Sequence, residues 1–215
     1  MQEIKTLQHM LQSSIALHAD RSCFSFVGSQ PMTYSMLGER VADTQRLLAS
    51  HGVGVGDKVA ILSHNMPNWG VAYMAVVSMG AVVVPLLPDF SRTEIENVLN
   101  HSDTKLVFMS ERTLPKIDGL SIPRVEARVM LETLASPFLD DAQSRSQTPL
   151  PSYAVRPNDL AAIIYTSGTT GKNKGVMLTH HNLVSQVKMA YHLQPVEKED
   201  VFLSILPLPH TYENS

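Results

Sequence analysis

Residues 57–88 have the sequence DKVAILSHNMPNWGVAYMAVVSMGAVVVPLLP, and this stretch decides the fold class. From Val59 to Pro88 it contains no Asp, Glu, Lys or Arg, which invites comparison with a membrane-spanning helix of ~20 apolar residues. Asparagine, glycine and proline nevertheless divide it into an apolar strand, a helix that begins at Pro67 and a second apolar strand at 81–85. Each piece is shorter than a bilayer is thick. We therefore predict buried core structure and no membrane span.

Strands and helices alternate at short spacing on both sides of this stretch. The predicted helices cover residues 4–18, 35–51, 67–79 and 91–100. The predicted strands cover residues 23–27, 32–34, 57–63, 81–85, 105–109, 160–165 and 200–206. Parallel strands need crossover helices and are apolar on both faces, so this alternation is typical of an α/β fold. We expect a doubly wound, mostly parallel sheet with flanking helices.

Two of the helix starts carry capping signals. Ser35 is predicted to cap the second helix, which Gly52 ends. Ser91 and Glu94 have the spacing of a capping box at the start of the fourth helix.

Prolines and serines interrupt the alternation between residues 136 and 158. We therefore predict a first α/β subdomain at 1–136, a linker or surface connection at 137–158 and the start of a second subdomain at 159–215. Residues 211–213 look like the first turn of a helix, and the sequence stops at Ser215. We expect the chain to be the amino-terminal part of a longer protein.

The composition excludes several classes of protein. The chain has 215 residues, with 17 Lys and Arg against 20 Asp and Glu, so its formal net charge is −3. This near-neutral balance gives no general attraction to nucleic acid. The single cysteine, Cys23, excludes an internal disulfide and a cysteine-based zinc site. The first residues lack the order of a signal peptide, so we expect a cytoplasmic protein.

The clearest chemical motif is AAIIYTSGTTGKNKGVMLTH at residues 161–180. An apolar strand leads into a loop with three glycines, four hydroxyl residues and two lysines. Glycines let backbone amides turn toward a ligand, and hydroxyl groups donate to phosphate oxygens. No acidic residue occurs at 160–196, where Lys172, Lys174 and Lys188 give a local charge of +3. The pattern favours a phosphate-binding loop over the alternative, a plain hairpin between two strands.

Two common nucleotide loops do not fit. Alignment of Gly171 and Lys172 with the Walker pattern puts Thr166 at the first glycine position and Asn173 at the Ser/Thr position. The glycines at 52–56 precede a predicted strand, whereas the Rossmann pattern follows one. We interpret residues 52–57 as a helix-to-strand turn.

Residues 165–175, YTSGTTGKNKG, resemble the signature loop of the adenylate-forming superfamily of acyl-CoA synthetases, luciferases and peptide-synthetase adenylation domains. Asn173 is one departure, because the family usually has proline there. Residues 32–37, 52–69 and 80–85 resemble other family segments, so the resemblance covers nearly the whole chain but only the first part of the family's large domain. Residues 206–213, LPLPHTYE, are similar to the form found in long-chain fatty-acyl-CoA synthetases.

The resemblance implies an enzyme, a long-chain fatty acid–CoA ligase. Such an enzyme uses ATP and Mg²⁺ to convert a fatty acid to acyl-AMP, and coenzyme A then accepts the acyl group. The implied phosphate-binding residues are Thr166, Ser167, Gly168, Thr169, Thr170, Gly171, Lys172, Lys174 and Gly175. Thr166 is also implied to help place Mg²⁺, and His210 to act at the acyl carboxylate or line the acyl pocket. Tyr212 is a weaker candidate for that pocket.

Plainer roles stay open for several of these residues. Lys174 is equally consistent with a solvated loop lysine, and His210 with a capping or packing residue. His180 and His181 suggest a metal site, but adjacent histidines point apart, so we interpret them as the start of a helix. Trp69 and the nearby methionines are predicted to belong to the core.

Two other functions are compatible with the same residues. One is a fatty acyl-AMP ligase that loads a carrier protein, and the other is a non-catalytic binding module that retains the fold. The resemblance also places the motifs for adenine and ribose, and the small domain with its catalytic lysine, beyond residue 215, so we expect this chain alone to be inactive. Acyl chain length, peripheral membrane contact and a homodimer are left undecided.

Overall fold

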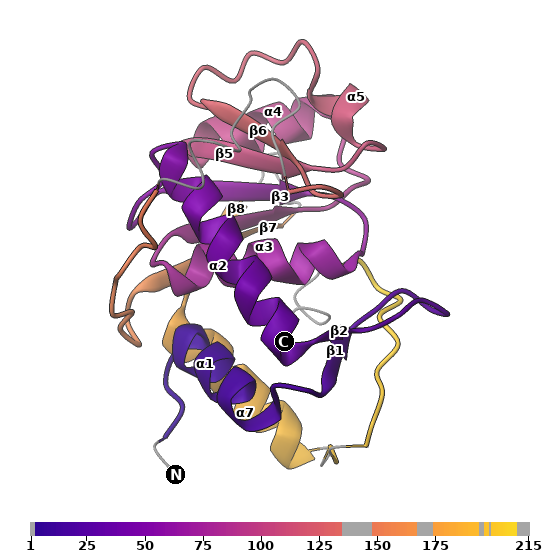
Figure 1. The fold of residues 1–215 in the computed structure, drawn as a ribbon. Helices are drawn as coiled ribbons and strands as arrows, with labels where there is room; N and C mark the ends of the chain where they lie inside the picture. The colour runs from indigo at the N-terminus through magenta and orange to yellow at the C-terminus, as the bar shows by residue number, and fades with distance from the viewer. Residues whose placement is uncertain (1–2, 135–147, 167–173, 194–195, 198, 210–215) are drawn as a thin grey trace.

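The computed structural model describes residues 3–134, 148–166, 174–193, 196–197 and 199–209. Its main feature is a six-stranded sheet in the order β6-β5-β3-β4-β7-β8 (Figure 1). The strands are β3 (Lys58–Leu62), β4 (Val82–Leu86), β5 (Thr104–Met109), β6 (Ala127–Met130), β7 (Leu160–Thr166) and β8 (Lys174–Thr179). All neighbouring strands are parallel except β7 and β8, which are antiparallel. The predicted doubly wound, mostly parallel sheet is confirmed.

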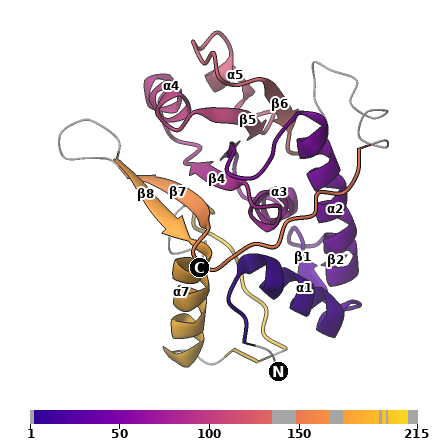
Figure 2. The same cartoon turned by 90° about the vertical axis from the view of Figure 1, so that its left-hand side faces the viewer.

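Helices cover both faces of this sheet. The first face packs against α1 (Leu7–His18), α2 (Tyr34–Ser50), α3 (Pro67–Ser78) and α7 (His180–Leu193). The second face packs against α4 (Arg92–His101) and α5 (Leu114–Ile117). Figure 2 shows α4 on one side of the sheet and α2 and α3 on the other. A small antiparallel pair, β1 (Ser22–Phe24) and β2 (Met32–Thr33), lies beside the first group.

The charge-free run forms the centre of the core, as predicted. It folds as β3, α3 and β4, and every residue of β4 is buried. Trp69 and Met79 are each 2% exposed, while Met66 and Met74 pack against the same core. Among the described residues, no helix combines the length and apolarity that a bilayer crossing requires.

The two predicted caps have different outcomes. The capping box is confirmed, because Ser91 Oγ accepts from the Glu94 N–H at 3.3 Å while Glu94 Oε2 accepts from the Ser91 N–H at 2.8 Å. The prediction for Ser35 is wrong. Thr33 caps α2 instead, with its Oγ1 accepting from the Met36 N–H at 3.2 Å. The helix begins earlier than expected because β2 ends at Thr33, and the chain turns directly into α2.

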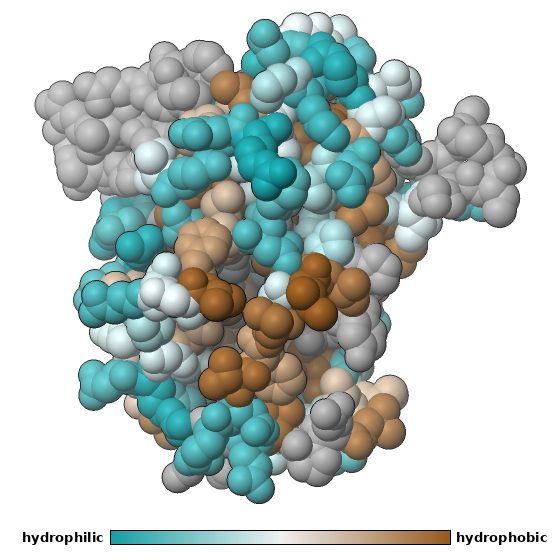
Figure 3. All heavy atoms as spheres, turned by 90° about the vertical axis from the view of Figure 1, so that its right-hand side faces the viewer, coloured by the Kyte–Doolittle hydropathy of each residue, from teal (hydrophilic) through white to brown (hydrophobic). Residues whose placement is uncertain are grey.

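The strand predicted at 200–206 is also wrong. These residues adopt no regular structure, and their apolar side chains face solvent, with Val201 94% and Ile205 80% exposed. A strand requires a partner, and no described strand pairs with this segment. In Figure 1 it is the yellow segment along the right-hand side, and Figure 3 shows apolar side chains gathered on that face.

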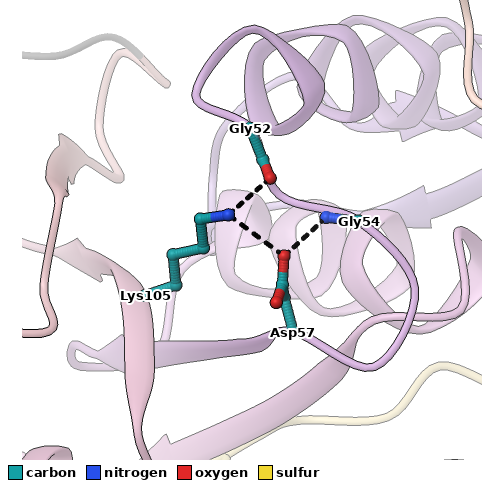
Figure 4. A network of polar contacts seen from close by, with 4 residues as sticks. All are labelled: Gly52, Gly54, Asp57 and Lys105. Atoms are coloured by element: carbon teal, nitrogen blue, oxygen red, sulfur yellow. Dashed lines mark hydrogen bonds and ion pairs between the residues drawn. The ribbon is translucent and has the colours of Figure 1, made fainter.

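The turn between α2 and β3 is fixed by one lysine (Figure 4). Lys105 Nζ donates to the Gly52 carbonyl oxygen at 2.6 Å and lies 3.3 Å from Asp57 Oδ2. The same carboxylate oxygen accepts from the Gly54 N–H at 2.9 Å. The glycine-rich segment is therefore the helix-to-strand turn that we predicted, tied to the neighbouring strand β5.

Residues 153–155 lie against α1 and the turn that joins α3 to β4. The Gln8 amide donates to the carbonyl oxygens of Ser78 at 2.8 Å and Tyr153 at 2.7 Å, and accepts from the Val155 N–H at 3.2 Å. From there the chain enters β7, which joins the same sheet as β3 and β4. The division of the chain into subdomains stays a prediction.

Gly80 gives a sharp test of this packing. Its φ is +81°, and an added Cβ would lie 2.5 Å from the Tyr153 ring, whereas Gly56 has φ +80° and nothing within 4 Å of an added Cβ. We expect Gly56→Ala to cost only the backbone strain, about 1 kcal/mol, and Gly80→Ala to cost about 1–3 kcal/mol more through overpacking. Urea unfolding of both variants measures the difference. Equal losses of unfolding free energy in the two variants would show that the contact with Tyr153 adds nothing to the cost of Gly80→Ala.

Candidate functional site

The carboxyl ends of the central parallel strands meet at one edge of the sheet. Because β3, β4 and β7 are mutually parallel neighbours, the residues after Leu62, Leu86 and Thr166 all emerge there. Open α/β sheets bind ligands at this edge. The glycine-rich motif therefore begins at the edge where a ligand site is expected.

Six of the predicted phosphate-binding residues lie outside the described residues. They are Ser167, Gly168, Thr169, Thr170, Gly171 and Lys172. His210 and Tyr212 also lie outside the described part of the chain. Thr166, Lys174 and Gly175 are described, and all three are exposed at the ends of β7 and β8.

The motif connects two antiparallel strands. Thr166 pairs with Lys174, and Tyr165 pairs with Gly175, so the residues that flank the motif face each other across the hairpin. In Figure 2 this hairpin projects from the body of the molecule. The hairpin geometry agrees with the plainer alternative from the sequence. It is equally compatible with phosphate binding, because the hydroxyl of Thr166 and the ammonium group of Lys174 are exposed on paired residues of the two strands.

Tyr165 anchors the base of the hairpin. Its side chain is 6% exposed, and its hydroxyl lies 2.7 Å from His101 Nδ1 at the end of α4. The two rings meet edge to face, with centroids 5.7 Å apart. Burial raises the pKa of the Tyr165 hydroxyl, a hydrogen bond with Ser102 partly offsets this rise, and the nearby Asp103 carboxylate adds to it, so the phenol stays neutral. No local sequence pattern indicates this pair, because the two residues are far apart in the chain.

Gly175 owes its place to the close approach of the two strands. A Cβ at this position would lie 2.9 Å from Ile163 Cγ2 and 3.2 Å from Tyr165 Cζ. The aromatic ring covers the glycine on the partner strand, an arrangement that stabilises glycine in a sheet. Packing alone therefore accounts for Gly175, whether or not its amide contacts a ligand.

The local charge of +3 expected at 160–196 is not concentrated at the motif. Lys188 lies on α7, and its Nζ is 3.3 Å from the Glu3 carboxylate, which also lies 3.4 Å from Lys5. The hydrogen bond from Lys188, followed by that from Lys5, lowers the pKa of Glu3. These residues line an open groove of about 640 Å³ between the N-terminal segment and α7. Lys174 is the described cation that flanks the motif.

His180 and His181 point apart, as predicted. His180 is fully buried, its Nδ1 accepts from the Leu7 N–H at 3.2 Å, and its Nε2 has no hydrogen-bond partner among the described residues. His181 is exposed at the start of α7. The described residues contain no group of three His, Cys, Asp or Glu side chains that could hold a metal ion. The histidine pair begins α7, and His180 links this helix to the start of α1.

Comparison with known families shows the class of protein. The chain belongs to the AMP-binding enzyme family, whose pattern matches residues 11–215. Fatty acyl-CoA synthetase A of Dictyostelium discoideum is 30% identical over 200 residues, which are 86% of this chain and 30% of that protein. Peroxisomal long chain acyl-CoA synthetase 6 of Arabidopsis thaliana is 31% identical over 201 residues, which are 86% of this chain and 28% of that protein.

Relatives with other chemistry match equally well. Surfactin synthase subunit 2 of Bacillus subtilis is 33% identical over 186 residues, 84% of this chain and 5% of that protein. The chain therefore spans less than a third of the length of these curated relatives. Among solved structures, the inhibitor-bound N-terminal domain of FACL13 from Mycobacterium tuberculosis matches with a TM-score of 0.85. It is 24% identical, and the match covers 96% of this chain and 52% of that one, which establishes the shared fold.

His180 predicts a pH dependence of stability. Burial lowers the pKa of its imidazole from 6.5 to about 4, partly offset by Asp159. Below pH 6.5 the unfolded state therefore binds a proton that the folded state does not bind until the pH approaches 4. The stabilisation is complete above pH 6.5 and is lost toward pH 4, by about 3 kcal/mol.

Urea unfolding from pH 8 to pH 4.5 measures this loss. In His180→Asn, the side-chain oxygen can still accept from the Leu7 N–H, and we expect a clearly smaller decline than in the wild type. His181→Asn, at the exposed neighbouring position, should retain the wild-type decline. Identical pH profiles for the wild type and His180→Asn would contradict the assignment.

Proposed function

We propose that this chain is the amino-terminal part of a long-chain fatty acid–CoA ligase. The complete enzyme would couple a fatty acid to AMP and then transfer the acyl group to coenzyme A. The observation that carries the proposal is the YTSGTTGKNKG motif, which begins at the carboxyl end of β7 in a chain of the AMP-binding family. A carboxylate is a poor acyl donor, and attachment to AMP gives it a good leaving group.

The residues at the motif suit this chemistry. Attack of the carboxylate on the α-phosphate needs positioning and charge stabilisation more than a protein nucleophile. We propose that residues 166–175 hold the β- and γ-phosphates of ATP through amides, hydroxyl groups and lysines. Thr166 and Lys174 are paired across the hairpin and exposed, so a hydroxyl and an ammonium group can reach one phosphate together. No carboxylate occurs on either strand to repel it.

The residues of the same site are compatible with Mg²⁺ if the protein supplies only a few of its ligands. Magnesium keeps several water ligands and is commonly shared with substrate phosphates, so it needs few protein oxygens. We propose the Thr166 hydroxyl as one of these. When bound, the ion would neutralise charge on the phosphates, and the chain's own contribution is to place the hydroxyl and the loop amides.

The substrate class rests on two observations. Residues 206–213 are similar to the form of long-chain enzymes, and two of the relatives carry names of fatty or long-chain acyl-CoA synthetases. We propose that His210 acts at the acyl carboxylate or lines its pocket. We also propose the division at 1–136, 137–158 and 159–215 for the organisation of this part of the enzyme.

The full reading frame provides the first test. We expect it to continue past Ser215, and the purified product to release pyrophosphate from ATP with palmitate and similar acids far faster than with acetate. Added coenzyme A should yield a thioester. Activity confined to acetate or to amino acids would refute the long-chain assignment. Transfer to a carrier protein and not to coenzyme A would identify a fatty acyl-AMP ligase.

Lys174 gives a residue-level test in the same enzyme. A charge-assisted hydrogen bond to phosphate contributes about 1.5–3 kcal/mol, so we expect Lys174→Met to lower kcat/KM for ATP about 10- to 100-fold. Lys188→Met is the matched control, because this lysine lies on α7, pairs with Glu3 and should leave kcat/KM unchanged when it is replaced. Equal activity of both variants would mean that Lys174 is a solvated loop lysine.

A further inference from the structure

We propose that Asn65 is a positioning residue that holds the segment Ser204–Leu208 at the carboxyl edge of the sheet, where this segment borders the acid-binding side of the proposed site. The first part of this proposal concerns the chain alone. The second part rests on the proposed function, because it assigns the segment to the acid-binding side of that reaction.

One amide side chain makes three hydrogen bonds to the segment. Asn65 Nδ2 donates to Ser204 Oγ at 2.9 Å and to the Leu206 carbonyl oxygen at 2.7 Å. Asn65 Oδ1 accepts from the Leu208 N–H at 2.9 Å. Both amide hydrogens and the amide oxygen are therefore used on residues about 140 positions later in the chain.

A local role for Asn65 is excluded by the same contacts. An asparagine just before a helix commonly accepts a hydrogen bond from the first helical turn. Here the N-cap of α3 is Met66, and no side chain caps this helix. The α3 start relies on Pro67 and on the backbone bond from the Trp69 N–H to the Met66 carbonyl at 2.9 Å. The amide of Asn65 thus serves the distant segment and not its own helix.

The sequence of the segment restricts its backbone up to Pro209. Pro207 and Pro209 flank Leu208, and each proline fixes φ near −65°. Leu208 packs against the core, and Pro209 is buried. With Leu206 and Leu208 both bonded to Asn65, the direction of the chain at Pro209 is set, and His210 follows directly in the sequence.

We call the three hydrogen bonds between Asn65 and the segment Ser204–Leu208 the clamp. The clamp lies on the same edge of the sheet as the phosphate motif. Asn65 follows β3, and Thr166 ends β7, with β4 as the one strand between them. Neighbouring strands are ~4.8 Å apart, so the two strand ends are roughly 10 Å apart across the sheet. This separation suits a substrate whose carboxylate must meet a phosphate held by the motif. In this proposal the segment Ser204–Leu208 borders the acid side of the site, and the β7–β8 hairpin borders the nucleotide side.

Amide hydrogen exchange on this chain tests the clamp directly. We expect the Leu208 amide to be protected in the wild type and to exchange at least tenfold faster in Asn65→Ala, while the amides of β3 and β4 keep their rates. Asn65→Asp is the second variant, because its carboxylate still accepts from the Leu208 N–H but repels the Leu206 carbonyl, so an intermediate rate is expected. Unchanged exchange at Leu208 in Asn65→Ala would overturn the proposal.

Asn68→Ala is the matched control. Asn68 lies three residues further along, and its amide donates to the Leu131 and Glu132 carbonyl oxygens, not to the segment. This variant loses a comparable set of hydrogen bonds but should leave exchange at Leu208 unchanged. Faster exchange at Leu208 in both variants would show a general loosening of the fold and overturn a specific clamp.

Kinetics of the enzyme from the full reading frame test the positioning role. We expect Asn65→Ala to raise KM for the acid at least tenfold, with KM for ATP within about twofold of the wild type. A merely structural role would lower kcat and leave both KM values unchanged, which would overturn the positioning part. The comparison uses whichever acid the wild type activates best. A wrong substrate class thus contradicts only the proposed function, whereas no activation of any acid overturns both.

Discussion

The need to cover an apolar sheet on both faces governs this structure. β3 and β4 carry almost no polar side chains, so each face must be packed against helices before either strand is stable in water. Because the strands are parallel, their carboxyl ends meet at one edge, and the crossover helices leave that edge uncovered by regular structure. The same requirement that builds the core thus also creates the place where a ligand can bind.

At that edge the chain combines rigid supports with short exposed groups. Tyr165 is buried and bonded to His101, Gly175 lets the partner strand approach, and the adjacent Thr166 and Lys174 face solvent. Strand ends held in this way keep a hydroxyl and an ammonium group side by side at the surface of the molecule.

The sequence was informative where neighbouring residues decide the structure. The charge-free run, the Ser91 capping box and the adjacent histidines were predicted correctly because periodicity, capping and side-chain direction are local properties. One local prediction failed, because Thr33 and not Ser35 caps α2. The other failures occur where a distant partner decides. Residues 200–206 have the apolar content of a strand but no described strand beside them, and Lys188, which was counted in the positive charge of 160–196, pairs with Glu3. The contacts of Asn65 depend on two segments that only the fold brings together, so no local pattern reveals them.

The antiparallel strand β8 has a consequence for the behaviour of the protein in solution. It is the last strand of the sheet as described, and its side chains are largely solvent-exposed, with Val176 46% and Met177 66% exposed. An open strand edge with apolar side chains recruits other strands, and charged side chains are the usual protection. Lys174 is the one charge in KGVMLT. Within β8, Lys174 is therefore the single charged side chain that opposes intermolecular β-pairing along this edge in the isolated polypeptide.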